Sequence, residues 1–390
     1  MAKELSLYVH IPFCESKCYY CNFVSKKATL KEKRNYVNFL LREIELNQNK
    51  DYIIKTIFIG GGTPSCLDAQ CIEKILLKIK ENFVLDENCE ITIEANPNSF
   101  DKNKATKYKQ IGINRISFGL QSASNKLLKK INRIHTKDDF VNSVKIAKEI
   151  GLNNINADIL VGLPYQRLFH VKSTLRLLKK LDIVHISCYS LILEENTPLY
   201  LMIKNKKFCL PSEEKTLKMF DYCNKFLTKN NIYRYEVSNF AKAGQECKHN
   251  LAYWNLDDYL GLGLNSHSKI GESRFENFSD FESYYQSLRN NKKPIKSIQK
   301  LSLSEQKEEF IMLGLRKTSG INLDEFKAKF NEDLKICKAK EIEFFEKNSF
   351  IKLENNFLKA TDLGFKVLNQ IILDLLWLNL IFNKKGKINF

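Results

Sequence analysis

The sequence contains no long hydrophobic run. Among its 390 residues no stretch of about 18 apolar residues occurs, which predicts that no helix spans a membrane. The first residues, Met1–Leu5, form no apolar secretory segment, so we expect a cytoplasmic protein. Arginine is scarce too: 10 arginines accompany 52 lysines, and the lysines are spread along the chain without a dense basic cluster. Despite the formal net charge of +17, we therefore expect no nucleic-acid partner.

Cysteine, by contrast, is plentiful, and three of the 11 cysteines share one short loop. Cys14, Cys18 and Cys21 follow the spacing C-x₃-C-x₂-C, and closely spaced soft thiolates suit an iron–sulfur cluster. A [4Fe–4S] cube has four irons, so three cysteines leave one iron open to an outside ligand. The alternative is a structural zinc knuckle with His10 as fourth ligand, although His10 lies in the strand-like run Leu7–Ile11. The other cysteines are scattered, and we expect them to be packed or idle thiols rather than disulfides.

Short β-branched runs alternate with amphipathic stretches over the first two-thirds of the chain, which is typical of βα units and a parallel sheet. The expected strands lie near Leu5–Ile11, Thr56–Ile59, Cys89–Ala95, Arg115–Leu120, Ile155–Val161 and Val184–Leu191. The expected helices between them lie near Lys31–Asn47, Asp68–Asn82, Asp101–Gln110, Asp138–Ile150 and Phe169–Leu181. Six strand–helix units are two short of a full barrel, so the sequence predicts an α/β fold with an open, six-stranded partial barrel.

Unusual polar residues fall where the expected strands end, which is the edge of such a barrel that carries chemistry. The cysteine loop follows the first strand, and the glycine run Gly60–Pro64 follows the second. Glycine runs serve tight turns, but bare backbone also lets a small zwitterion approach closely. The later strands carry, in order, Glu94, Gln121, Asp158 and Ser190. The sequence therefore predicts a ligand site on one rim.

The stretch Tyr8–Cys14, followed by Cys18, Tyr20 and Cys21, resembles the radical S-adenosylmethionine (SAM) superfamily. Within it the chain resembles, over about residues 5–370, the branch of oxygen-independent coproporphyrinogen III dehydrogenase and the HemW-type haem chaperones. The resemblance implies a (βα)₆ partial barrel that binds a [4Fe–4S] cluster through the three cysteines, together with SAM. It assigns cofactor contacts to Tyr8, Tyr20, Gly61, Gly62, Thr63, Glu94, Gln121, Arg133 and Asp158, with Ser190 as a looser match.

Three features separate the chaperones from the dehydrogenase within this branch. The dehydrogenase carries a further cysteine two residues after the triad, where this chain has Phe23, and it has a long N-terminal extension, whereas this triad begins at residue 14. The run His249–Trp254 also resembles the H-N-x-x-Y-W signature of the chaperones. We therefore expect a haem chaperone that serves haem-requiring apoproteins such as respiratory enzymes; the alternative is the dehydrogenase, so whether the chain is an enzyme stays open. A radical SAM enzyme acting on RNA is favoured by the net charge alone.

His249 is the predicted haem contact, as axial ligand or as a donor to one. The alternative is that His249, Tyr253 and Trp254 form an aromatic patch that closes the bottom of a sheet. The expected domains are a partial barrel over 1–235, a connecting segment with the H-N-x-x-Y-W motif over 236–300, and a helical, winged-helix-like domain over 301–375. The tail, 376–390, is expected to be a frayed extension, or a site of peripheral membrane contact.

Overall fold

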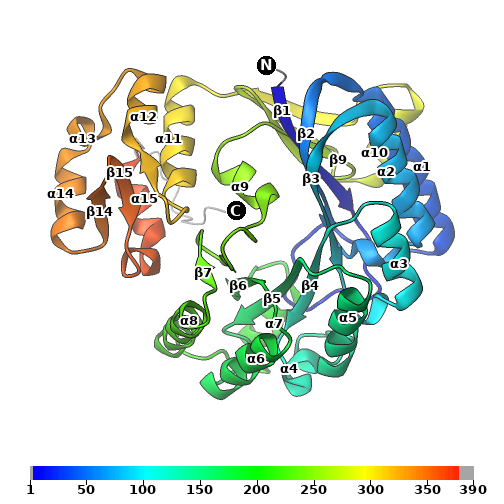
Figure 1. Ribbon diagram of the computed structural model, residues 1–390, viewed down its shortest axis with the longest axis horizontal. Coiled ribbons are helices and arrows are strands. Elements are labelled where there is room, and N and C mark those ends of the chain that lie inside the picture. The colour runs from blue at the N-terminus through cyan, green and yellow to red at the C-terminus, as the bar shows by residue number, and fades with distance from the viewer. Residues whose placement is uncertain (1–2, 377–390) are drawn as a thin grey trace. The chain divides into compact units, whose positions relative to one another are not determined.

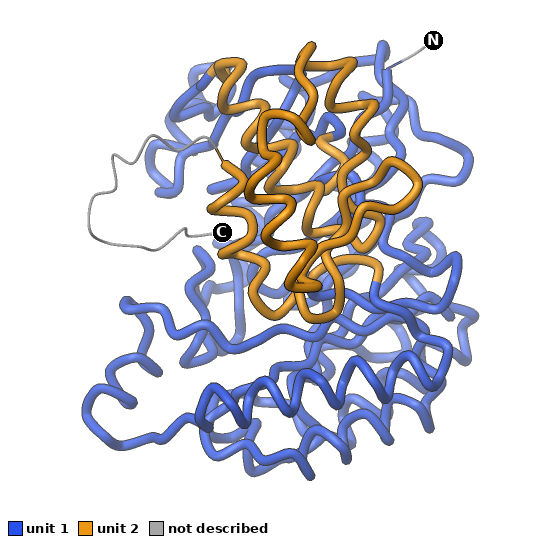
Figure 2. Tube along the Cα trace, turned by 90° about the vertical axis from the view of Figure 1, so that its left-hand side faces the viewer, with its two compact units in different colours: residues 1–234, 238–253, 257–299 blue, residues 235–237, 254–256, 300–390 orange. Residues whose placement is uncertain are grey.

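The computed structural model describes residues 3–376 of the chain (Figure 1). These residues form two compact units, which Figure 2 shows in two colours. The first unit comprises residues 1–234, 238–253 and 257–299, and the second comprises 235–237, 254–256 and 300–390. No helix among the described residues is long and apolar enough to cross a membrane.

Six parallel strands in sequence order form the centre of the first unit. They are β1 (Lys3–Ile11), β2 (Asn49–Gly61), β3 (Phe83–Ala95), β4 (Arg115–Gln121), β5 (Ile155–Val161) and β6 (His185–Ser190). The helices between them are α1 (Leu30–Leu46), α2 (Ala69–Asn82), α3 (Lys102–Gln110), α4 (Asn125–Lys130), α5 (Lys137–Glu149) and α6 (Leu168–Lys180), and they lie along the outer side of the curved sheet (Figure 1). The predicted α/β partial barrel is confirmed. β2 and β3 begin earlier than predicted, because their first halves are too polar to read as strands.

The sheet continues past the six strands on both edges. β9 (Tyr259–Leu262) pairs parallel to β1, and the sheet then runs through β10 (His267–Ile270) and β11 (Ser273–Asn277) to β12 (Ile295–Lys300). At the other edge β8 (Asn239–Ala241) pairs antiparallel with β6 and with β7 (Tyr233–Arg234). The remaining helices of the unit are α7 (Pro198–Lys204), α8 (Glu213–Thr228), α9 (Lys248–Trp254) and α10 (Phe281–Arg289). Most of segment 236–300, expected as a connector, thus belongs to the first unit and adds strands to its sheet.

Alternation along the central strands separates the core from the site. Successive side chains of a strand point to opposite faces. In β3 to β6 one set is apolar and belongs to the main hydrophobic cluster, with Ile93, Phe118 and Ala157 as examples. The other set is polar: Glu90, Thr92 and Glu94; Arg115 and Ser117; Asn156 and Asp158; His185 and Ser187. The inner face of the barrel is therefore lined with buried polar groups that need partners from the chain or from a ligand.

The second unit has its own core and a three-stranded sheet in the order β13-β15-β14. Its elements are α11 (Leu303–Gly314), β13 (Ile321–Asn322), α12 (Leu323–Phe330), α13 (Leu334–Cys337), α14 (Ala339–Lys347), β14 (Ile351–Glu354), β15 (Phe357–Ala360) and α15 (Leu368–Leu375). This order of helices, short strand and hairpin is winged-helix-like, as predicted. Lys338 separates α13 from α14. The predicted tail from residue 377 onward lies outside the described residues.

Candidate metal and cofactor site

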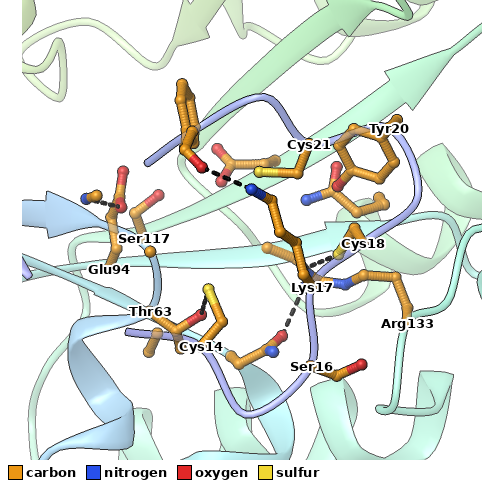
Figure 3. A pocket seen from close by; sticks show the side chains of 18 residues that line it. Cys14, Ser16, Lys17, Cys18, Tyr20, Cys21, Thr63, Glu94, Ser117 and Arg133 are labelled. Atoms are coloured by element: carbon orange, nitrogen blue, oxygen red, sulfur yellow. Dashed lines mark hydrogen bonds between the residues drawn. The ribbon is translucent and has the colours of Figure 1, made fainter. Parts of the chain in front are cut away.

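One pocket of the first unit, of about 140 Å³, gathers most of the predicted site residues at the carboxyl ends of the strands (Figure 3). The predicted residues that line it are Cys14, Cys18, Tyr20, Cys21, Gly61, Gly62, Thr63, Glu94, Gln121, Arg133 and Asp158. They come from the cysteine loop and from the ends of β2, β3, β4 and β5, with Arg133 following α4. Residues more than 140 positions apart thus line one cavity.

The cysteine loop is held at its base by backbone hydrogen bonds and along its length by the side chain of Asn132. Cys14 donates its N–H to the carbonyl of Lys26 at 3.0 Å, and Lys26 donates its own to the carbonyl of Pro12 at 3.0 Å. Asn132, in the turn after α4, donates to the Ser16 hydroxyl at 3.1 Å and to the Lys17 carbonyl at 2.9 Å. The loop therefore presents its thiols from a fixed backbone, as a metal site requires.

The three thiols approach the pocket from different directions, as Figure 3 shows for Cys14, Cys18 and Cys21. Among the described residues, no three or more His, Cys, Asp or Glu side chains converge tightly enough to hold a single metal ion. A zinc site needs four ligands around one point, whereas in a cube each thiolate binds a different iron. His10 does not line the pocket, because its ring nitrogens face the Tyr8 hydroxyl at 3.0 Å and the Val24 carbonyl at 3.3 Å. The donor set fits an iron–sulfur cube better than a zinc knuckle.

Polar groups next to the thiols complete this donor set. The Thr63 hydroxyl lies 3.6 Å from Cys14 Sγ, and Arg133 Nη1 lies 3.5 Å from Cys18 Sγ. Both groups can donate to a thiolate, and such outer contacts orient and tune metal ligands. Burial raises the pKa of the Cys21 thiol, which a bound cation would counteract.

Gly61 and Gly62 must be glycines because the cysteine loop approaches their backbone closely. Gly62 donates its N–H to the carbonyl of Ile11 at 2.9 Å, and a Cβ at Gly62 would stand 2.6 Å from the carbonyl oxygen of Phe13. Gly61 has φ +112°, and a Cβ there would stand 2.7 Å from the His10 ring. Both glycines also line the pocket. Their bare backbone therefore serves the packing of the loop and leaves room for a ligand.

Two half-buried carboxyl groups, those of Glu94 and Asp158, and the half-buried guanidinium of Arg133 supply the charge of the pocket. Burial, together with the charge of Asp158, raises the pKa of Glu94 to about 8, while Glu94 accepts the Gly61 N–H at 3.1 Å. Burial also raises the pKa of Asp158. Arg133 Nη2 donates to Asn96 Oδ1 at 2.5 Å and to the carbonyl of Gly119. Its buried Nε has no partner among the described residues, which fits an anionic ligand group such as a carboxylate.

Three predicted contacts do not line this pocket. Tyr8 donates to or accepts from the His10 ring and stacks on Phe58 with ring centroids 6.3 Å apart. Ser190, at the end of β6, is exposed. His249, on α9, lies near Tyr8, with the two ring centroids 6.5 Å apart.

His249 is buried, and both of its ring nitrogens have partners. Nδ1 lies 2.7 Å from the Thr56 hydroxyl and Nε2 lies 2.9 Å from the Tyr253 hydroxyl, while the ring stacks on Phe58. Burial and the nearby Arg115 charge lower the pKa of His249 to about 3, so the ring is neutral. An axial bond to haem iron would require one of these contacts to break, and the position fits the aromatic patch that was the alternative. The haem role of His249 stays a prediction.

Sequence reasoning missed several polar residues of the site. Asn96, Ser117 and Gly119 line the pocket. Asn156 does not line it, but its side chain hydrogen-bonds the Asp158 carboxyl group. A signal was present for Ser117 and Asn156, because each precedes a predicted rim residue on the same face of its strand. Asn96 directly follows the strand end that Glu94 marks.

Comparisons with known proteins agree on one family. Residues 8–178 match the model of the Radical SAM superfamily, and residues 301–367 match that of the HemN C-terminal domain. The chain is 36% identical over 334 residues to the heme chaperone HemW of Bacillus subtilis (strain 168), covering 84% of this chain and 88% of that protein. It is 34% identical over 371 residues to the heme chaperone HemW of Lactococcus lactis subsp. lactis (strain IL1403), covering 95% of this chain and 97% of that protein.

A solved structure shares the fold across nearly the whole chain. It is the coproporphyrinogen III oxidase (HemN) from Escherichia coli, which is described as a radical SAM enzyme. The TM-score is 0.84 at 21% identity, with 96% of this chain and 90% of that chain covered. At this identity the likeness concerns the fold, including the C-terminal helical domain.

Proposed function

The chain belongs to the radical SAM superfamily and, within it, to the family of HemW proteins, and on that premise we propose that it is a haem chaperone. It binds haem and passes it to haem-requiring proteins. The observation that carries the proposal is that relatives named heme chaperone align at 34–36% identity over 88–97% of their own length. The proposed recipients are apoproteins such as respiratory enzymes, met in the cytoplasm or by peripheral contact with a membrane surface.

Cys14, Cys18 and Cys21 would hold the [4Fe–4S] cluster on the rim of the barrel. When bound, the cluster supplies an iron with a free coordination position beside SAM. Arg133 Nε would donate to the SAM carboxylate, and Gly61 and Gly62, which line the pocket, would present their backbone to its amino group. The carboxyl groups of Glu94 and Asp158 would accept from the ammonium or from ribose hydroxyls.

Phe23 supports the chaperone over the dehydrogenase. It occupies the position at which the dehydrogenase carries a further cysteine, and its side chain is 66% exposed at the wall of the pocket. An apolar ring there offers no thiol for chemistry beside the cluster. Exposed apolar surface at a pocket is typical of binding rather than of packing.

The test is a haem titration of anaerobically reconstituted protein, followed through the Soret absorbance. A parallel sample is assayed for decarboxylation of coproporphyrinogen III. We expect saturable haem binding and no decarboxylated product. Product formation without haem binding would show that the dehydrogenase is the correct assignment.

The same titration tests His249. His249→Ala should weaken haem binding and shift the Soret band while the iron content of the cluster stays unchanged. His267→Ala is the matched variant, because His267 is an exposed histidine at the start of β10. An unaltered spectrum and affinity in His249→Ala would leave His249 a structural residue and make His267 the next candidate.

A further inference from the structure

Asn156 lies on the polar inner face of the barrel, beside the pocket. It belongs to β5, precedes Asp158 by two residues on the same face, and is 2% exposed. Asn156 does not line the pocket that Asp158 lines. Its amide instead joins three neighbouring strands, β4, β5 and β6, through side-chain hydrogen bonds.

The contacts of Asn156 fix the orientation of its amide. Nδ2 lies 2.7 Å from Asp158 Oδ1 and 2.7 Å from the Ser117 hydroxyl. A carboxylate only accepts, so the NH₂ group must face Asp158. Oδ1 then accepts from His185 Nδ1 at 2.7 Å and from the Ser187 hydroxyl at 3.1 Å. Each donor and acceptor of this amide is used, so the side chain has one possible orientation.

We propose that Asn156 is a positioning residue for the SAM site: its amide holds the Asp158 carboxylate in place for the ligand. The proposal rests on the proposed role of Asp158 in SAM binding. A buried carboxylate needs hydrogen bonds to stay ionised, and Asn156 supplies one at 2.7 Å from a direction away from the ligand. The side of Asp158 that faces the pocket stays available.

A purely structural role for Asn156 makes a different prediction. If the amide only joined β4, β5 and β6, its loss would lower stability and leave SAM affinity unchanged, or would act independently of Asp158. If it acts through Asp158, its effect on SAM affinity must disappear once Asp158 is gone. A double-mutant cycle between the two residues separates these cases.

The experiment measures SAM affinity by equilibrium dialysis on the reconstituted full chain, for the parent, Asn156→Ala, Asp158→Ala and the double variant. A hydrogen bond to a charged group is worth roughly 1.5–3 kcal/mol, so Asn156→Ala should weaken SAM binding about tenfold or more. In the Asp158→Ala background the same change should have almost no further effect. Iron content and the urea midpoint are recorded for every variant.

Asn277→Ala is the matched control, because Asn277 is also a buried amide that donates to a buried carboxylate. Its Nδ2 lies 2.6 Å from Glu43 Oε1, and neither residue lines the pocket. It should lose stability while keeping its SAM affinity. If Asn156→Ala does not fold, Asn156→Asp takes its place in the experiment, because Asp has the same shape as Asn but lacks the amide donor.

The outcomes separate the inference from its premise. Loss of affinity in Asp158→Ala alone, with Asn156→Ala and Asn156→Asp equal to the parent, would overturn the role of Asn156 and leave the site in place. Unchanged affinity in both single variants would remove Asp158 from the site. Additive losses in the double variant would make Asn156 a structural residue, and a parent that binds no SAM would contradict the proposed function itself.

Discussion

Position relative to the pocket distinguishes the three loop cysteines from the other thiols of the chain. Cys14, Cys18 and Cys21 line the pocket, whereas Cys66 directs its thiol to the carbonyl of Phe13 at 3.5 Å and lies outside it. Burial raises the pKa of Cys66 to about 11, so it stays a thiol at neutral pH. Thiolates, not thiols, are the ligands that iron needs.

Replacing any one of Cys14, Cys18 and Cys21 by Ala should therefore abolish the cluster. The parent, prepared anaerobically, should contain about four irons per chain, and the variants close to none. Cys66→Ala is the control and should keep its iron, because it removes a thiol that contacts the residue before Cys14 without changing the donor set. Iron and zinc analysis with the visible spectrum measures both. Stoichiometric zinc without iron in the parent would contradict the cluster.

The pattern of strands in the sequence predicted part of the pocket lining. Glu94 near the end of the third strand, Gln121 after the fourth and Asp158 within the fifth all line the pocket, because parallel strands bring their carboxyl ends to one edge. Their role in binding stays a prediction. Asn156 was missed although it precedes Asp158 by two residues on the same face of β5, because its partners on the neighbouring strands, Ser117 and His185, cannot be recognised in a single sequence. The burial of His249 depends likewise on β2, almost 200 residues away.

Among the elements, α9 shows how the H-N-x-x-Y-W motif is held in the barrel. Its N-terminal N–H groups, those of Lys248 and His249, each donate to the carboxylate of Glu90 at 3.2 Å. The Cys247 thiol also points to this carboxylate at 3.4 Å. Glu90 belongs to β3, so the helix is capped by a residue from a distant strand, and its negative charge also opposes the positive end of the helix.

Glu90→Ala should loosen α9 and leave buried N–H groups without an acceptor. We expect a loss of roughly 1–3 kcal/mol in the free energy of unfolding, and faster hydrogen exchange in residues 248–254. Glu90→Gln keeps an acceptor oxygen and should lose less. Urea unfolding and amide exchange measure the two effects. Equal exchange of α9 in the parent and in Glu90→Ala would show that the helix does not depend on this cap.

The sequence was less informative about elements beyond the six βα units. The long amphipathic helices and the buried parallel strands repeat a clear period, and they were predicted. β9, β10 and β11 have only four or five residues and include polar side chains, so no period develops in them. They form only because β1 offers an open edge, and this follows from tertiary structure.

For the whole molecule, the polar interior of the barrel has a consequence for stability. Burial lowers the pKa of His10 to about 4 and those of His135 and His249 to about 3, and it lowers the pKa of His185 well below its usual value. These four rings are neutral in the folded protein. In the unfolded chain each would bind a proton below about pH 6.5.

Glu43 has the opposite effect on how stability depends on pH. Burial raises its pKa to about 7, although it accepts from the Tyr284 hydroxyl at 2.6 Å and from the Gly263 N–H at 2.8 Å. Between its unfolded pKa, about 4.3, and pH 7 the folded state holds this proton more tightly than the unfolded state. Its contribution to stability is thus complete below about pH 4 and is lost as the pH rises through 7.

These opposing groups predict how the stability of the protein depends on pH. Near pH 5.5 the unfolded state binds about two protons more than the folded state: four at the histidines, less one at Glu43 and one at Glu94, whose pKa burial raises to about 8. Stability should therefore rise by about 2–3 kcal/mol per pH unit between pH 5 and 6 and level off between pH 6 and 7. Glu43→Gln removes one opposing contribution, so the rise should become steeper, by about 1.4 kcal/mol per pH unit. Urea unfolding at pH 5, 6, 7 and 8, with iron content recorded at each pH, measures both, and stability that stays constant from pH 7 to 5 would mean that the histidines are not held neutral.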